Sequence, residues 1–366
     1  MKVRYLNLAV ADEKERRELL EAVEKVLLHG RIVIGPEVDE FEKECSLFCG
    51  KTYGVGVNSG SDAVHLALRS LGIGPGDEVI TTCLSWVATA NAISMTGARP
   101  VFVDVRNDFN IDPFKIEESI TPRTKAILPV HFAGKVCDMD AIMEIANKHG
   151  LPVVEDAAQA FGATYKGKKA GSFGRVNAFS MNPMKVFAAC GEAGIVLTND
   201  EHIRDMLLAL RYNGALDRME AHFPSLNSRL DTIQAAMLLC RLRNHSASIE
   251  RRRAAVAYYN CFLDGVVGTP SEYADCVDVY YLYNAICDER DRLKAFLEER
   301  GVETKINHPL LMPRQKAYRK DYGAFEWPVG ESLTRTTLCL PLHANITREE
   351  QDYVIESVKL FYEKKA

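Results

Sequence analysis

The sequence predicts an α/β protein built on a mostly parallel, seven-stranded sheet with helices on both faces, followed by a smaller α+β domain. Between about residues 52 and 199, short apolar runs alternate with segments of helical periodicity. Most of these runs are continuously apolar, which is typical of strands buried on both faces. The 366 residues can bury more than one hydrophobic core. Repeated strand–helix units favour a parallel sheet.

The first predicted element is a helix over about Asp12–Leu28. The clearest helix between the strands is Asp138–His149, because Asp138 can cap its start and Gly150 ends it. The seven core strands are expected at Tyr53–Val57, Glu78–Cys83, Pro100–Val105, Ala126–Phe132, Pro152–Glu155, Asn177–Met181 and Gly194–Thr198.

The pattern changes after about Ser228. The smaller domain is expected to hold a long helix, a strand, a second helix and a second strand, at Ile233–Phe262, Tyr280–Ile286, Asp291–Arg300 and Val302–Ile306. We therefore expect a large domain over residues 1–240 and a small one over 241–366. The N-terminal helix is expected to pack on one of them, either the large domain or the small one.

Composition argues against several classes of protein. The net charge of −5 and the lack of a helix-turn-helix or zinc pattern disfavour nucleic-acid binding. No apolar run approaches the roughly 20 residues that span a membrane. The first residues become charged too soon for a signal peptide. Ten cysteines occur without Cys-x-x-Cys or Cys/His spacing, so no metal site is expected. A cytoplasmic protein with reduced thiols fits these features.

One basic run, around Arg241, Arg243 and Arg251–Arg253, lies in the long predicted helix. It is either a solvated helix face or a contact for an anionic substrate or a partner subunit.

A first candidate site follows the strand at Tyr53–Val57. The turn Asn58-Ser-Gly-Ser61 leads into a helix that starts at about Asp62. Free backbone N–H groups at a helix N-terminus bind anions, and Gly60 allows close approach, so a phosphate fits over Ser61 and Asp62. The alternative is a tight turn in which Ser and Asp cap the helix.

Two more candidates lie at other strand ends, where α/β sheets bind ligands. Trp86 follows a predicted strand and is either a core residue or a platform for a planar ring. Asp156 ends another strand; its carboxylate needs a partner there, such as a protonated ring nitrogen, unless it caps a helix. Gln159 lies one turn further along and could bond a ring hydroxyl or the substrate.

Lys185 lies in a polar turn between two apolar runs, in Ser180-Met-Asn-Pro-Met-Lys185. A lysine held there can form a Schiff base. A phosphate cup, an aromatic plate, a carboxylate for a ring nitrogen and this lysine are the four parts of a pyridoxal phosphate site. Each part is at or near a strand end, so the sequence predicts this cofactor.

The motifs resemble the DegT/DnrJ/StrS-type sugar aminotransferases, a family of fold-type-I pyridoxal phosphate enzymes in the aspartate aminotransferase superfamily. The resemblance covers nearly the whole chain. It includes Gly35-Pro-Glu-Val-Asp-Glu-Phe-Glu42, Gly72-Ile-Gly-Pro-Gly-Asp-Glu-Val-Ile80, Pro129-Val-His-Phe-Ala-Gly134, Glu155-Asp-Ala-Ala-Gln159, Leu226-Asn-Ser-Arg-Leu-Asp231 and Leu340-Pro-Leu-His343.

The resemblance implies a role for each matching residue. Lys185 would form the Schiff base and shuttle the proton, Asp156 would pair with the pyridine nitrogen, and Trp86 would stack on the ring. Gln159 would lie beside the ring oxygen. The phosphate would be held by Ser61, Asp62 and Ser180, and by Asn227 of the neighbouring subunit, so the resemblance implies a homodimer with shared sites.

Substrate contacts are less fixed by the resemblance. Arg229 matches the family's Asn-x-Arg, and His131 and His308 are pocket candidates or hydrogen-bonded structural histidines. Met181 and Met184 stand where the family has an aromatic residue and a hydroxyl. In the small-domain motif His308 replaces a tyrosine, and Pro313 stands where a histidine is expected.

The resemblance implies an aminotransferase, of the EC 2.6.1 type, that loads its cofactor as pyridoxamine phosphate from an amino acid such as L-glutamate. The acceptor would be a keto-sugar, expected to be a nucleotide-linked 3- or 4-keto deoxysugar, in amino-sugar, glycan or antibiotic biosynthesis. Alternatives on the same cofactor are keto-cyclitol transamination, aromatization to an aminobenzoate and sugar dehydration. A non-enzymatic regulatory or sensory relative is an alternative of another class.

Overall fold

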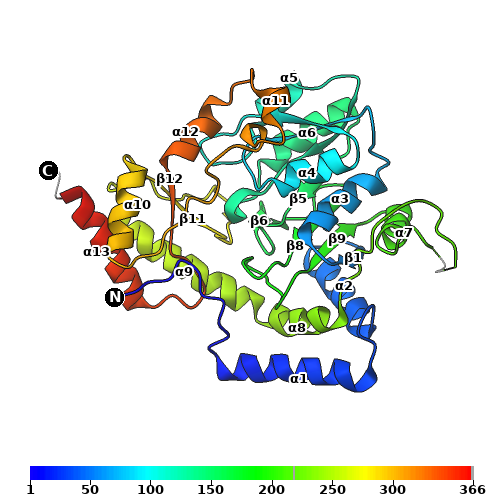
Figure 1. Cartoon of the computed structure of the whole chain (residues 1–366), viewed down its shortest axis with the longest axis horizontal. Coiled ribbons are helices and arrows are strands. Elements are labelled where there is room, and N and C mark those ends of the chain that lie inside the picture. The colour runs from blue at the N-terminus through cyan, green and yellow to red at the C-terminus, as the bar shows by residue number, and fades with distance from the viewer. Residues whose placement is uncertain (217–218, 364–366) are drawn as a thin grey trace.

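The computed structural model describes residues 1–216 and 219–363 and shows the expected α/β architecture (Figure 1). All seven predicted core strands are present; two have the predicted ends and the other five are shifted or shortened at one or both ends. They are β1 (Tyr53–Val57), β2 (Glu78–Thr82), β3 (Arg99–Val103), β4 (Thr124–Leu128), β5 (Val154–Asp156), β8 (Val176–Ser180) and β9 (Gly194–Thr198).

These strands form one continuous layer. The ladder β3-β2-β4 and the ladder β5-β8-β9-β1 are joined by parallel bridges between Ile127 and Val153 and between Val130 and Asp156. The resulting order is β3-β2-β4-β5-β8-β9-β1. Among these described strands, β9 runs antiparallel to both of its neighbours and the remaining pairs are parallel. The prediction of a mostly parallel, seven-stranded sheet is confirmed.

Helices cover both faces of this sheet, which explains the continuous apolar runs. On β9, Ile195 and Leu197 pack in the cluster that includes residues of α2 and α6, whereas Val196 packs in the cluster that includes residues of α3 and α7. The helices of this part are α2 (Pro36–Phe48), α3 (Gly60–Ser70), α4 (Ala88–Met95), α5 (Pro113–Glu118), α6 (Met139–His149), α7 (Glu201–Leu210) and α8 (Thr232–Arg243).

The C-terminal part is the predicted α+β arrangement, with two differences. The long helix is interrupted at Asn244, which separates α8 from α9 (His245–Leu263). The segment expected as a strand at Val302–Ile306 makes only isolated bridges in the described chain, from Val302 to Val3 and from Lys305 to Cys339. The remaining elements are β11 (Tyr283–Ile286), α10 (Arg290–Glu299), α11 (Arg319–Tyr322), α12 (Pro328–Thr336), β12 (Thr337–Leu340) and α13 (Arg348–Glu363).

Short elements complete the fold. They are β6 (Thr164–Tyr165), β7 (Lys168–Lys169), β10 (Cys276–Val277) and the 3₁₀ turns η1 (Phe132–Gly134) and η2 (Met312–Arg314).

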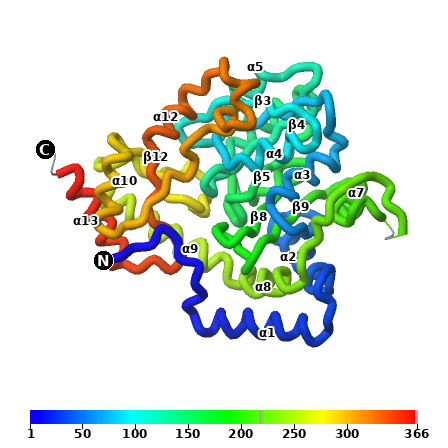
Figure 2. The backbone as a smooth tube through the Cα atoms, viewed as in Figure 1, coloured from blue at the N-terminus to red at the C-terminus, as the bar shows by residue number. Residues whose placement is uncertain are grey.

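The N-terminal segment contacts both parts of the molecule. Helix α1 (Glu13–His29) begins after Asp12, whose side chain accepts a hydrogen bond from the Glu15 backbone N–H. It lies along α8 (Figure 2). Upstream of α1, Val3 pairs with Val302 of the C-terminal part. The proposed boundary at residue 240 falls inside α8 and stays a prediction.

Three further features concern the molecule as a whole. Within the described residues, no helix is long and apolar enough to cross a membrane, and no group of three or more His, Cys, Asp or Glu residues could hold a metal ion. All ten cysteines are free thiols.

Candidate active site

Lys185 lies in the turn that follows β8. The turn is closed by Asn182, which accepts hydrogen bonds from the Met184 N–H through its side chain (3.0 Å) and from the Lys185 N–H through its backbone oxygen (2.8 Å). The Lys185 Nζ lies 4.5 Å from the ring centroid of Tyr281. Burial lowers the pKa of Lys185 to about 8, while the charges of Asp156 and Glu192 act in the opposite direction. A substantial fraction of this amine is therefore neutral and nucleophilic near neutral pH.

Asp156 ends β5, and its side chain is only 4% exposed. Its Oδ2 accepts a hydrogen bond from the Thr89 hydroxyl (2.8 Å) and its Oδ1 from the Ala158 N–H (3.2 Å). Burial raises the pKa of Asp156 above its usual value, although these two bonds and the charge of Lys185 oppose the shift. No lysine or arginine lies within ion-pair distance of it in the described chain. A buried carboxylate in this state fits a cationic ring nitrogen.

The residues predicted to hold a phosphate lie where α3 meets the end of β8. Ser59 caps α3, because its hydroxyl accepts the Asp62 N–H (3.1 Å) and its backbone oxygen accepts the Ala63 N–H (3.0 Å). The N–H groups of Gly60 and Ser61, at the start of the helix, have no partner inside it. A Cβ on Gly60 would lie 2.3 Å from the Ser180 Cβ. Only glycine therefore allows this helix end to lie against Ser180. This contact places the start of α3, which holds Ser61 and Asp62, against the end of β8 at Ser180; their role in binding a phosphate stays a prediction.

We predict that Gly60→Ala weakens cofactor binding at least about 10-fold and destabilises the fold by about 1–3 kcal/mol, because the added methyl group overpacks the contact with Ser180. Cofactor titration and thermal unfolding measure the two effects. Gly74→Ala is the matched control, because a Cβ there would lie 3.8 Å from its nearest neighbour. Equal behaviour of the two variants would contradict the tight cradle.

Trp86 is exposed, whereas Gln159 is buried. Trp86 lies in the loop between β2 and α4 and is 63% exposed, so it is not a core residue of the single chain. Gln159 is buried, and its Oε1 accepts the Ala133 N–H (2.8 Å), which leaves its amide NH₂ as the donor for a ligand. The backbone of Ala133 has a φ of 54°, in the left-handed region.

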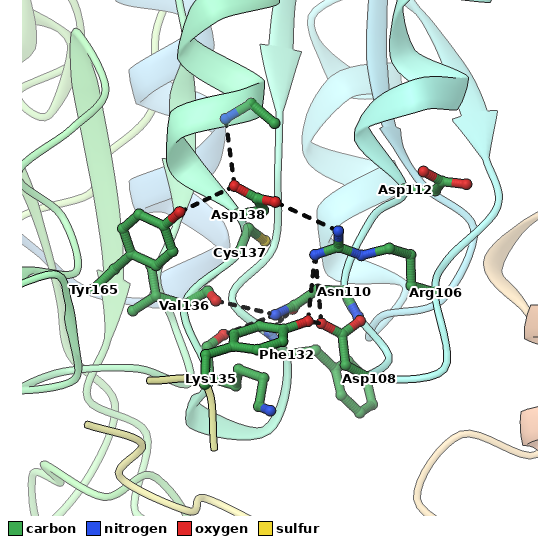
Figure 3. Close-up of polar contacts among 12 residues, drawn as sticks. Arg106, Asp108, Asn110, Asp112, Phe132, Lys135, Val136, Cys137, Asp138 and Tyr165 are labelled. Carbon is green, nitrogen blue, oxygen red and sulfur yellow. Dashed lines mark hydrogen bonds and ion pairs between the residues drawn. The ribbon is translucent and has the colours of Figure 1, made fainter. Parts of the chain in front are cut away.

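A polar cluster holds the segment that contains Ala133 (Figure 3). The Asn110 side chain donates to the carbonyl oxygens of Lys135 and Val136 (3.3 Å each) and accepts the Phe132 N–H (3.0 Å). Nearby, Arg106 bridges towards Asp138, which also accepts the Tyr165 hydroxyl (3.0 Å). These bonds stabilise the turn against which Gln159 is positioned.

His131 is buried and its ring contacts the carboxylate of Glu155. Its Nε2 lies 2.8 Å from Glu155 Oε2, and its Nδ1 accepts the Cys137 N–H (3.2 Å). Glu155 also accepts the N–H groups of Gly171, Phe173 and Gly174. Burial alone would raise the pKa of Glu155, but these bonds hold it below its usual value. Both ring nitrogens of His131 are engaged, so the geometry favours the structural alternative over a substrate contact.

We expect His131→Leu to lower the free energy of unfolding by about 3 kcal/mol or more, because it leaves part of a buried carboxylate without its partner. Urea unfolding measures this. His202→Leu, at an exposed position, is the control and is expected to change little. A loss of substrate affinity at unchanged stability would instead support a pocket role for His131.

His308 lies near enough to Lys185 for the charge of the lysine to act on its pKa. Burial, with the charges of Lys185 and Lys305, lowers its pKa to about 3, so its imidazole is neutral. Its Nε2 accepts the Asn307 amide N–H (3.1 Å), and its ring lies 5.2 Å from that of Phe132. It remains a candidate for a substrate contact.

Asn227 and Arg229 form a separate pair. The Arg229 Nε donates to Asn227 Oδ1 (2.7 Å), and its guanidinium lies 4.9 Å from the Tyr212 ring centroid. Asn227 is exposed. Within the described residues, neither side chain is hydrogen-bonded to Lys185, Asp156 or Ser180. The structure of the single chain therefore does not join them to the site.

Sequence reasoning missed two site residues. Thr89 bonds Asp156, and Tyr281 lies beside the Lys185 amine. The sequence contains only a weak indication of Thr89: it lies three residues after Trp86, at the start of α4. The sequence contains no indication of Tyr281, because its contact with Lys185 depends on how the C-terminal part packs.

The residues present fit the cofactor. The Gly60–Ser180 cradle suits a phosphate, the buried Asp156 needs a cation, and Lys185 offers a partly neutral amine. The fold and this site define a fold-type-I, pyridoxal phosphate-dependent aminotransferase.

Comparison with known proteins gives the family. The model of the DegT/DnrJ/EryC1/StrS aminotransferase family matches residues 13–359, and the chain belongs to this family. It is 40% identical to dTDP-3-amino-3,4,6-trideoxy-alpha-D-glucose transaminase of Streptomyces venezuelae, over 99% of this chain and 97% of that protein. It is 38% identical to a pleiotropic regulatory protein of Geobacillus stearothermophilus, over 99% of each chain.

A solved structure with the same sequence identity also has the same fold. The crystal structure of S. venezuelae DesV in complex with a ketimine intermediate superimposes with a TM-score of 0.95, at 40% identity and 98% coverage of both chains. The family resemblance found in the sequence is confirmed.

Proposed function

We propose that this protein transfers an amino group from an amino acid, with L-glutamate as the expected donor, to a nucleotide-linked keto-sugar. The observation that carries the proposal is that a partly neutral lysine, Lys185, lies near enough to a buried carboxylate, Asp156, for the charge of each to act on the pKa of the other. The sugar acceptor is supported by the relative that acts on a dTDP-linked amino sugar.

Each side chain has a defined task. When bound, pyridoxal phosphate supplies an electron sink that makes the α-C–H bond of the amino acid acidic. Asp156 would hold the proton of the ring nitrogen, and Thr89 orients the carboxylate. Lys185 would accept the proton from the donor α-carbon on its amine, and would return a proton in the second half-reaction on the sugar side. Ser61, Asp62 and Ser180 would hold the phosphate.

The space beside Lys185 suits a large acceptor. A cavity of about 810 Å³ is lined by Lys185, Met184, residues 6–10 and the start of α9. This volume lies within the usual range for ligand sites, at about 300–1,000 Å³. Met184, where the family has a hydroxyl, faces this cavity, so we assign this unusual flank to the acceptor side.

The test is a panel of nucleotide-linked amino sugars run in reverse, with pyridoxamine phosphate formation as the readout. We expect turnover with at least one of them. Turnover only with an amino-cyclitol would favour that alternative, and product dehydration or aromatization would favour the other reactions. No transfer from any amine would favour the regulatory alternative, which one relative's name raises.

We further propose that the working unit is a cytoplasmic homodimer with shared sites. Trp86 and Asn227 are exposed in the single chain, as expected of residues that lie near a partner, and the unpaired cysteines suit a reducing compartment. If Asn227 acts in the partner's site, mixing Lys185→Ala with Asn227→Ala chains should restore activity that neither variant has alone. Absence of restoration in mixed dimers, verified by mass, would contradict shared sites.

A further inference from the structure

Arg252 is a buried cation without an acidic partner. It lies on α9 with 4% of its surface exposed, and its Nη1 donates to the Tyr280 carbonyl oxygen (3.0 Å). Within the described residues it forms no ion pair. Its neighbours differ, since Arg253 pairs with Glu272 and Arg241 with Glu15. Of the alternatives for the basic run, a solvated helix face is therefore wrong for Arg252.

His343 is a second buried polar side chain that lines the same cavity as Arg252. It follows β12, is 4% exposed, and neither ring nitrogen has a hydrogen-bond partner in the described chain. Burial lowers the pKa of His343; the charge of Glu350 opposes this shift, and the charge of Arg252 adds to it. Both line the cavity that also contains Lys185.

Tyr281 connects this pair to the reacting amine. Its ring lies 4.5 Å from the Lys185 Nζ, and it also interacts electrostatically with Arg252. Burial lowers the pKa of Arg252 to about 10, which still leaves the guanidinium charged at neutral pH. An unpaired buried charge is costly, so a ligand anion at this place would be strongly favoured.

We propose that Arg252 and His343 bind a carboxylate of the amino donor. A guanidinium presents its N–H groups in a fork that matches a carboxylate, and a neutral imidazole adds one N–H. Because Arg252 is almost fully covered, a small planar group such as a carboxylate fits it better than a nucleotide diphosphate. The inference rests on the proposed function, and it adds the residues that select the donor.

The direct test is the binding of glutarate, a dicarboxylate without an amine, to the cofactor-loaded enzyme by calorimetry. Arg252→Gln and His343→Leu are each expected to weaken glutarate binding about 10-fold or more. Arg252→Lys keeps the charge and should retain part of the affinity. Arg243→Gln, at an exposed position on α8, is the matched control and should bind like the wild type.

A second arm separates the possible anions and roles. Uridine diphosphate binding should be unchanged in Arg252→Gln, and the KM for L-glutamate should rise while that for the sugar stays constant. Loss of nucleotide binding with intact glutarate binding would overturn the proposal, as would unchanged glutarate affinity in both variants. An equal fall in both half-reactions with a lower melting temperature would assign a structural role instead. Failure of the proposed function would differ, since the wild type would then transfer no amine.

Discussion

Lys185→Ala is expected to lower turnover by about three orders of magnitude or more and to remove the visible absorbance of the bound cofactor. Two tasks depend on this one amine, since it forms the covalent link to the cofactor and moves the proton in both half-reactions. Its lowered pKa, about 8, is what makes both tasks feasible near neutral pH. Steady-state kinetics and absorbance spectra of the purified variant measure the two effects.

Lys168→Ala is the control for the loss of a positive charge, because Lys168 is exposed, lies in β7 and does not line the cavity beside Lys185. Its turnover should equal that of the wild type. If Lys185→Ala kept normal turnover, Lys185 would not be the catalytic lysine.

Asp156→Asn is expected to have the second largest effect, a loss of about 100- to 1,000-fold in kcat with little change in fold. The amide keeps the size of the side chain and can still bond Thr89, but it cannot hold the ring nitrogen in its protonated form. Because burial raises the pKa of Asp156, the carboxylate is poorly solvated without a partner. The cofactor-free variant should therefore be at least as stable as the cofactor-free wild type.

Two measurements check this second prediction. Single-turnover kinetics give the loss in rate, and thermal unfolding without cofactor gives the change in stability. Thr89→Val removes only the supporting hydrogen bond and should cost clearly less activity. If Asp156→Asn destabilised the cofactor-free protein strongly at unchanged kcat, the carboxylate would have a structural role.

The seven core strands could be predicted because each is buried on both faces, so its residues are continuously apolar. Their order could not, because the composition of a strand does not state its neighbours. The antiparallel direction of β9 is set by its pairing with β8 and β1. The break at Asn244 was missed because no proline or glycine marks it.

The candidate site also has residues that the local sequence predicts and residues that it does not. Lys185, Asp156 and Gly60 could be predicted because each follows or ends a strand, where parallel sheets bring side chains together. Residues that act through long-range contacts could not. Thr89 reaches Asp156 across 67 positions, and Tyr281 reaches Lys185 only when the C-terminal part has packed.

The roles of Arg252 and His131 could not be decided from the sequence, for the same physical reason. Arg252 lies in a basic run that resembles a solvated face, and only its burial reveals the missing partner. The sequence left His131 open between a pocket and a structural role, and only the contact with Glu155 favours the second. Charge patterns along a chain do not report which side chains fold inwards.

The central claim is that Lys185, Asp156 and the Gly60–Ser180 cradle form an amino-transfer site. The most direct measurement is a titration of the cofactor-loaded enzyme with L-glutamate, following the visible absorbance and the keto acid released. We predict that the absorbance disappears as one keto acid per site is released, and that a nucleotide-linked keto-sugar restores it. An unchanged spectrum with every amino acid tested and no keto acid would contradict the claim.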